Sequence, residues 1–321
     1  MKRKKLVLAV SAAVLLGGYT VGIFGQTEGD LTQKQIDNPN TLENKEEIIS
    51  GVVSFCESVL ESTGRSEQYD LRDLGDVTVY LGSDVTGNPQ DAIVTVSFGP
   101  KNTVVAAYTA DGNVYEYTGD LGDFYGVQNI RFVPVPELKK EIVIVREQVN
   151  QSLGSFEQSD ILRGYVFDGK EYQDVLNTPQ KIESSWNNLW NKGELQEPSL
   201  WRRVTEETES KWTGGEEPSL TITRYQSYLE SDDKGEGEVP ADDTFQEKDS
   251  RVVVERFFWS DEWNRFILDE AVEVATGQPV AIIENLASSP YLLADLPDFK
   301  DYRIVRKDGT TAYVDAEELK F

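Results

Sequence analysis

Histidine is absent from the 321 residues of this chain, and cysteine occurs once, as Cys56. The lack of histidine excludes Ser-His-Asp and Cys-His catalysis, histidine-ligated zinc and histidine-based pH switching. A single cysteine excludes an intramolecular disulfide, so stability must come from a hydrophobic core. Because Cys56 lies among apolar residues at helical spacing, we predict a buried side chain rather than a reactive thiol.

Basic residues are scarce as well, since 31 Lys and Arg stand against 57 Asp and Glu, a net charge of −26. Residues 1–25 hold four basic residues and no acidic one, which leaves −30 on the remaining chain. A field of this sign repels phosphate backbones and anionic lipids, so we predict no nucleic-acid partner. The same field favours cations and cationic partners, or serves only to keep the protein dispersed.

The N-terminus has the charge layout of an export signal. Basic residues at positions 2–5 precede an uncharged, largely apolar run at 6–25. A helix of these 20 residues, at about 1.5 Å each, spans the hydrocarbon core of a bilayer. A signal cleaved after Gly25 and a buried helix of a cytosolic fold are the alternatives. The basic flank predicts an extracytoplasmic protein, secreted or anchored in the cell membrane through this N-terminal helix only.

The rest of the chain divides into a spacer and two folded regions. Residues 26–43 are polar and lack a hydrophobic period, which predicts a flexible linker. The first folded region covers 44–192, and a Gly, Glu and Pro-rich piece at 193–199 marks its boundary. The second region covers 193–321. Within it, residues 230–250 are rich in Asp, Glu, Gly and Lys and predict a long mobile loop.

Hydrophobic periodicity predicts one helix followed by many strands. Apolar residues recur every three or four positions from Ile48 to Leu60, before the stop signal Gly64. Asp111-Gly112 and Asp168-Gly169 separate strand-like runs and predict tight hairpin turns. Residues 182–190 fit a helix or a strand equally well. The expected strands are 77–81, 92–98, 103–109, 114–117, 127–133, 141–149, 161–167, 172–176, 220–229, 251–259, 263–268, 280–284, 302–306 and 311–314.

The fold class that follows is mainly β. We expect antiparallel, blade-like sheets, arranged as a partial propeller or a sandwich, with one N-terminal amphipathic helix and a smaller β-rich C-terminal region. The C-terminal runs 302–306 and 311–314, joined by Lys307-Asp308-Gly309, form a further hairpin that resembles the last strands of a small SH3-like barrel.

The string at 84–94, DVTGNPQDAIV, is polar at first and leads directly into an expected strand. Together with the hairpin at 109–113 it resembles the FG-GAP/VCBS repeat of β-propeller and cell-surface proteins, over about residues 70–180. In that family an Asp-rich loop opens each blade and can hold calcium through oxygen ligands. The resemblance implies an extracytoplasmic binding or scaffolding role, and a calcium site formed by Asp84, Asn88 and Asp91.

The loop departs from the family pattern in two places. Asn88-Pro89 replaces the usual Asp-Gly, and Ala92 stands where an acidic residue is common. An Asx-stabilised turn that feeds a strand is therefore the alternative to calcium binding at these positions.

A catalytic site without histidine would need paired carboxylates, as in glycosidases. The segment 259–263, WSDEW, combines carboxylates with aromatic rings that can stack on sugars, although Phe257, Phe258 and Phe266 nearby favour an aromatic hairpin with one buried face. Our leading hypothesis is an exported or membrane-tethered, non-enzymatic binding or scaffolding protein that engages a protein or cell-envelope component. The alternatives are a carboxylate-dependent glycan hydrolase, with two close carboxylates in a deep cleft, and a calcium-stabilised surface scaffold.

Overall fold

The chain is mainly β, as predicted, with antiparallel sheets, a helix near the N-terminus and a smaller C-terminal sheet. Two compact units are formed, one by residues 1–147 and 165–173, the other by 148–164 and 174–321. The computed structural model describes residues 5–6, 8–10, 23–25, 42–82, 84–88, 91–99, 102–111, 114–135, 138–152, 156–188, 200–214, 218–233, 238–296 and 300–321.

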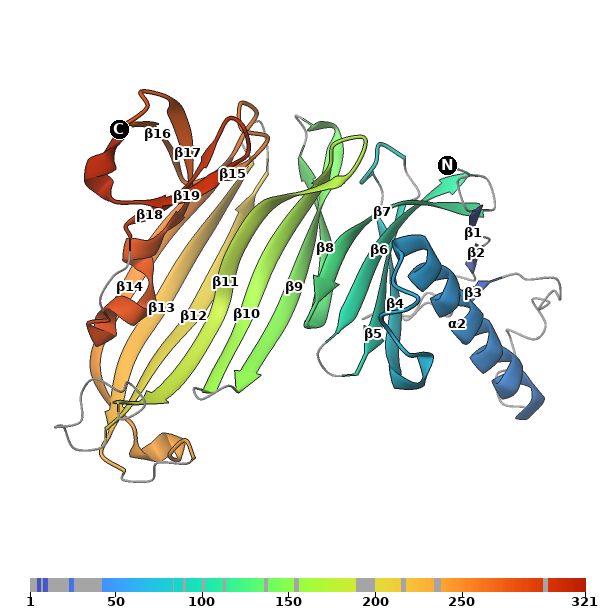
Figure 1. Cartoon of the computed structure of the whole chain (residues 1–321), viewed down its shortest axis with the longest axis horizontal. Coiled ribbons are helices and arrows are strands. Elements are labelled where there is room, and N and C mark those ends of the chain that lie inside the picture. Colours follow the sequence, from blue (N-terminus) through green and yellow to red (C-terminus); the bar gives the residue numbers. More distant parts are fainter. Residues whose placement is uncertain are drawn as a thin grey trace. The chain divides into compact units, whose positions relative to one another are not determined.

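The first sheet has five strands in the order β1-β7-β6-β5-β4, and β4 to β7 form a meander like a propeller blade. Helix α2 (Leu42–Thr63) precedes it, which confirms the predicted amphipathic helix (Figure 1). Gly64 ends the helix with a φ of +73°, the left-handed conformation typical of helix stops. The strands are β1 (Lys5–Leu6), β4 (Leu74–Gly82), β5 (Asp91–Phe98), β6 (Thr103–Asp111) and β7 (Val114–Phe124).

Strand β5 is buried on both faces, which explains its nearly continuous apolar sequence. On one face, Val94 and Val96 join a cluster with Phe55 and Cys56 of α2. On the other, Ile93 packs in a cluster with residues of β8 to β10 that belong to the same unit. Cys56 is fully buried, as predicted, and burial raises the pKa of its thiol to about 12.

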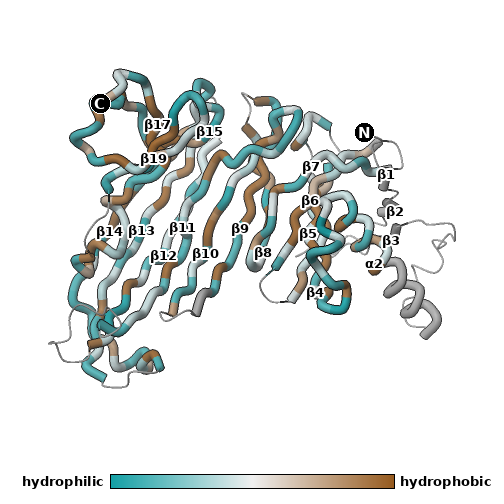
Figure 2. The backbone as a smooth tube through the Cα atoms, viewed as in Figure 1, coloured by the Kyte–Doolittle hydropathy of each residue, from teal (hydrophilic) through white to brown (hydrophobic). Residues whose placement is uncertain are grey.

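The second sheet has eight strands in the sequential order β8 to β15. Figure 2 shows hydrophilic and hydrophobic residues interspersed along its strands. The hairpin turn predicted between β10 and β11 is confirmed, since Gly169 has a φ of +103° there. The strands are β8 (Gly126–Val135), β9 (Lys140–Ser152), β10 (Phe156–Phe167), β11 (Tyr172–Asn187), β12 (Trp201–Thr213), β13 (Ser219–Ser231), β14 (Gln246–Ser260) and β15 (Arg265–Ile267).

Strand β12 was not predicted from the sequence. Its exposed face carries Glu207, Glu209 and Lys211, and these charges hide the alternation with the buried Val204 and Glu206 on the other face. Residues 182–187, which fit either element, belong to β11. The predicted boundary at 193–199 lies outside the described residues, and the strands on its two sides, β11 and β12, pair with each other.

The acidic segment 230–250, expected to be a long mobile loop, contains regular secondary structure. Strand β13 continues to Ser231 and β14 begins at Gln246, so regular pairing reaches into both ends of the segment. Helix η4 (Asp242–Thr244) lies between them, and Asp242 accepts a hydrogen bond of 2.7 Å from Arg203. The Arg203 guanidinium also stacks on the Phe245 ring, 3.9 Å from its centroid. These contacts attach the segment to β12, an attachment that composition alone does not reveal.

The third sheet has five strands in the order β19-β18-β17-β16-β20. Val280, Ile282 and Ile304 are central to its own small core. The predicted C-terminal hairpin is confirmed at its predicted bounds, with Gly309 in the turn at a φ of +83°. The strands are β16 (Asp269–Glu273), β17 (Pro279–Asn285), β18 (Tyr302–Arg306), β19 (Thr311–Val314) and β20 (Leu319–Lys320).

Three short pieces of the apolar run at 6–25 are strands: Leu6 ends β1, and β2 (Leu8–Val10) and β3 (Ile23–Gly25) pair with each other. These paired strands differ from the continuous helix expected there. The rest of the run lies outside the described residues, as does the expected linker up to its last two positions, where α2 begins. No helix in the described part of the chain combines the length and apolar character needed to cross a bilayer.

Candidate functional site

The second unit contains a cavity of about 240 Å³. Strands β11 to β14 and β17 line it, together with the short helices η5 (Leu286–Ser288) and η6 (Pro290–Ala294). Apolar side chains supply much of the lining, which suits an organic ligand rather than a bare ion. They include Ile182, Phe257, Ile283, Leu286, Pro290 and Tyr291.

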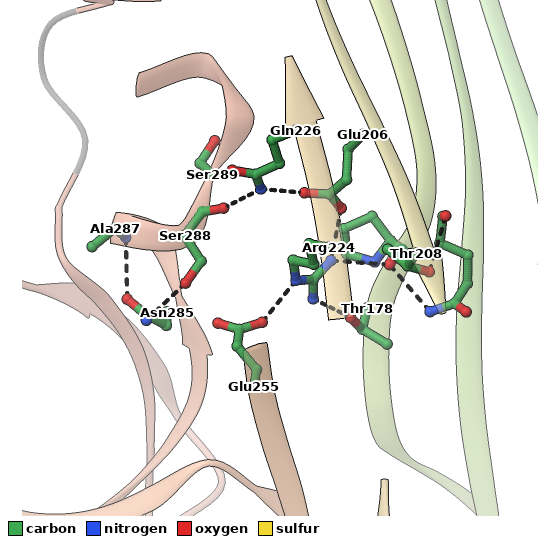
Figure 3. A network of polar contacts seen from close by, with 12 residues as sticks. Thr178, Glu206, Thr208, Arg224, Gln226, Glu255, Asn285, Ala287, Ser288 and Ser289 are labelled. Carbon is green, nitrogen blue, oxygen red and sulfur yellow. Dashed lines mark hydrogen bonds and ion pairs between the residues drawn. The ribbon is translucent and has the colours of Figure 1, made fainter. Parts of the chain in front are cut away.

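Arg224 of β13 is the centre of the polar part of the cavity. Its Nη1 donates to Oε1 of Glu206 at 2.7 Å, and its Nε donates to Oε2 of Glu255 at 2.8 Å. Nη2 donates to the hydroxyl of Thr178 at 2.8 Å, and Nη1 also reaches the carbonyl oxygen of Pro179 at 3.1 Å. Figure 3 shows the two carboxylates on either side of the guanidinium. The guanidinium of Arg224 thus binds two buried glutamates, one on each of the strands that flank β13.

A second row of polar side chains connects the sheet to η5 and η6. Glu206, Gln226 and Arg251 are register neighbours on β12, β13 and β14. The Gln226 amide nitrogen donates to Glu206 and to the carbonyl oxygen of Ser288, the latter at 2.6 Å. Arg251 donates to Oε1 of Gln226 and to the carbonyl oxygen of Ser289, each at 2.7 Å. These bonds position the segment that closes one side of the cavity (Figure 3).

Burial and charge act in opposite directions on the cavity glutamates. Burial raises the pKa of Glu206 above its ordinary value, although Arg224 and Gln226 lower it. Burial also raises the pKa of Glu284, against the lowering effect of Arg303 and Arg224. Glu284 pairs with Arg303 at 3.8 Å, and its side chain is 40 % exposed. The cavity is therefore lined by two buried carboxylates, Glu206 and Glu255, and by Glu284, which reaches the surface.

Glu255 differs from Glu206 in how its two oxygens are used. Its side chain is 7 % exposed, and Oε2 is bonded to Arg224. Oε1 is buried and has no hydrogen-bond partner among the described residues. In Figure 3 this oxygen points away from Arg224, toward the segment that carries Asn285 and Ser288. A buried acceptor of this kind favours a ligand that donates a hydrogen bond.

Asp84 and Asn88 lie in the segment before β5, and Asp91 is the first residue of that strand and has protein partners of its own. Asp91 is buried and accepts the backbone N–H of Thr86 at 2.7 Å and the hydroxyls of Thr86 and Thr109. The Asn88 amide donates to the carbonyl oxygen of Ala110 at 3.0 Å, and the Asp84 carbonyl oxygen accepts the N–H of Glu141 at 2.9 Å.

These bonds are the ones expected of a side-chain-stabilised turn. No group of three or more Asp, Glu, Cys and His side chains in the described part of the chain is arranged to hold a metal ion. Calcium binding by Asp84, Asn88 and Asp91 stays a prediction.

The segment 259–263 forms the aromatic hairpin that the sequence favoured. Trp259 pairs with Phe266 across β14 and β15, with ring centroids 5.4 Å apart and nearly perpendicular planes. Trp259 also donates to Asp261 at 2.9 Å, while Glu262 forms an ion pair of 2.6 Å with Lys307. The carboxylate of Asp261 therefore binds within the hairpin, and that of Glu262 binds Lys307.

Sequence reasoning missed the cavity residues altogether. Glu206 and Arg224 are 18 positions apart, and Arg224 and Glu255 are 31 apart, in a chain where acidic residues are abundant. One signal was present: Arg224 and Glu255 interrupt strands whose neighbouring positions on the same face are apolar, Ile222 and Phe257. A charge at an inward position of a strand needs a partner across the sheet.

No family model, curated protein or solved structure matches the chain.

Proposed function

We propose that this chain is a non-enzymatic binding protein that works outside the cytoplasm, and that the cavity of the second unit is its binding site. The single observation that carries the proposal concerns Glu255, a residue of the cavity lining whose Oε1 is a buried acceptor with no partner among the described residues. The export-like N-terminus and the net charge of −26 support the setting and an envelope partner.

The glycan-hydrolase alternative draws support from the same cavity, because two buried glutamates line it and burial raises the pKa of Glu206. A hydrolase of this kind needs one carboxyl group that can give a proton to the leaving group and a second that acts as base or nucleophile. Here Glu206 and Glu255 both bind the Arg224 guanidinium. The same guanidinium thus engages both carboxyl groups, a geometry that suits recognition better than proton transfer.

A ligand screen on the full chain tests the binding function. The melting temperature is measured with four sets of small molecules, namely organic cations, organic anions, neutral sugars and zwitterionic amino acids. We expect one set to raise it in a saturable way, and the Ile182→Trp variant, which places an indole in the cavity, to abolish the rise. No saturable rise with any set would overturn the proposal. Release of reducing ends from cell-envelope polysaccharide would instead establish the hydrolase.

The extracytoplasmic setting has its own test. In intact bacteria that express the full chain, an externally added protease is expected to degrade it while a cytoplasmic marker survives. Full protection of the chain until the cells are lysed would contradict this part of the proposal.

A further inference from the structure

The charges that line the cavity determine which ligand it suits. Glu206, Glu255 and Glu284 contribute three carboxylates, and Arg224 is the lining residue of opposite charge. Arg224 already bonds Glu206, Glu255, Thr178 and the carbonyl oxygen of Pro179. Glu284 is paired with Arg303 at 3.8 Å, so the uncompensated negative charge belongs to Glu206 and Glu255, which share the single cation Arg224. A cation is the ligand that offsets it.

The unpartnered oxygen narrows the kind of cation. Oε1 of Glu255 is an acceptor without a donor among the described residues, so the ligand must bring a hydrogen-bond donor. The N–H of an ammonium group supplies the donor and the positive charge together. A quaternary ammonium has no N–H and leaves this oxygen unsatisfied. A bare metal ion does not use the apolar lining formed by Phe257, Ile283 and Leu286.

The size of the cavity limits the size of the cation that can bind. A volume of about 240 Å³ is below the usual range for drug-sized ligands, about 300–1,000 Å³. It suits one ammonium group on a short alkyl chain, with the chain against the apolar lining and the charge at the carboxylates.

Building on the proposed binding function, we infer that the cavity binds a primary alkylammonium group, whose N–H bonds are accepted by Oε1 of Glu255 and by Glu284. The group comes either from a free amine or from a lysine side chain of a polypeptide. Both sources present the same chemistry to the cavity.

Calorimetric titration of the full chain separates the sources and tests the inference. The probes are n-butylammonium chloride and Nα-acetyl-lysine N-methylamide, with Nα-acetyl-norleucine N-methylamide as the neutral analogue and tetramethylammonium as the cation without N–H. Both primary amines are expected to bind in a saturable way, and the two comparison compounds are not. Tighter binding of the lysine derivative identifies a polypeptide source, and tighter binding of n-butylammonium identifies a free amine.

Variants locate the site. Glu255→Gln keeps a carbonyl oxygen for Arg224 but turns an amide NH₂ toward the ligand, and we expect amine affinity to fall about tenfold or more. Glu284→Gln, at a half-exposed position that tolerates the change, should weaken binding in the same direction and keeps the test valid if Glu255→Gln does not fold. Glu262→Gln is the matched control, because Glu262 is 59 % exposed and pairs with Lys307 away from the cavity.

Two results would overturn the inference: no binding of either amine, or amine binding that neither Glu255→Gln nor Glu284→Gln weakens. The proposed function fails separately. A sugar or an organic anion that binds the wild type but not Ile182→Trp, while neither primary amine binds, refutes the alkylammonium ligand and leaves the binding function in place. If no compound of the four sets binds, both fail.

Discussion

Arg224 and Glu255 share a hydrogen bond of 2.8 Å between Nε and Oε2, and this bond uses only one of the two carboxylate oxygens. Glu206 is different, because Arg224 binds one of its oxygens and Gln226 binds the other. Arg224 thus binds one oxygen of each glutamate, and Gln226 completes the bonding of Glu206 alone. Glu255 is the glutamate that gives the cavity a binding group.

Replacing Arg224 should cost much of the stability of the second unit. Arg224→Leu leaves Glu206 and Glu255 buried without their cation, and the free energy of unfolding is expected to fall by about 3–5 kcal/mol. Urea unfolding followed by tryptophan fluorescence measures the change. Arg72→Leu is the control, since Arg72 is 89 % exposed in its pair with Asp70 and should change stability by less than about 1 kcal/mol. Equal effects of the two substitutions would contradict a central role for Arg224.

Amine binding should weaken as the pH falls from neutral. Burial raises the pKa of Glu284, with Arg303 and Arg224 lowering it and Glu255 raising it, so the carboxylate takes up a proton at a higher pH than the ordinary 4.5. The neutral acid no longer attracts an ammonium group. Titrations with n-butylammonium over a pH series measure this, and Glu284→Gln is expected to flatten the curve. An unaltered pH dependence in the variant would exclude Glu284 as the titrating group.

Cys56 should be inert while the protein is folded. Its thiol is fully buried and its pKa is raised to about 12, so almost no thiolate is present at neutral pH. A thiol-specific reagent is expected to label it only as urea unfolds the first unit, with a midpoint that matches the fluorescence transition. Stoichiometric labelling of the native protein would show that the α2 cluster opens readily.

Asp91 should matter for stability whether or not calcium binds. Asp91→Ala leaves the Thr86 N–H and two threonine hydroxyls without their buried acceptor, at a cost of about 1–3 kcal/mol. Urea unfolding in the presence of a chelator measures this cost. A change within experimental error would mean that the turn holds without this carboxylate.

Calcium binding itself has a separate test. If Asp84, Asn88 and Asp91 hold calcium, millimolar calcium raises the melting temperature of the wild type and not that of Asp84→Ala. A wild-type melting curve that calcium leaves unchanged would rule out the site.

Local signals predicted much of the secondary structure. The spacing of apolar residues in α2 and the stop at Gly64 were readable because a helix places every third or fourth residue on one face. The strands β18 and β19 were found at their exact bounds, since alternation and a turn glycine coincide there. Strand β12 was missed because its solvent face is charged and its buried face includes Glu206.

The sequence by itself determined the β-rich class, the lone helix signal, the acidity and the absence of histidine chemistry, because these depend on composition and on contacts between near neighbours. Only the tertiary structure decided that Glu206, Arg224 and Glu255 meet and that Ser288, 62 positions beyond Gln226, closes over them. That meeting depends on the register of β12, β13 and β14, and a shift of one residue would turn all three side chains to the opposite face.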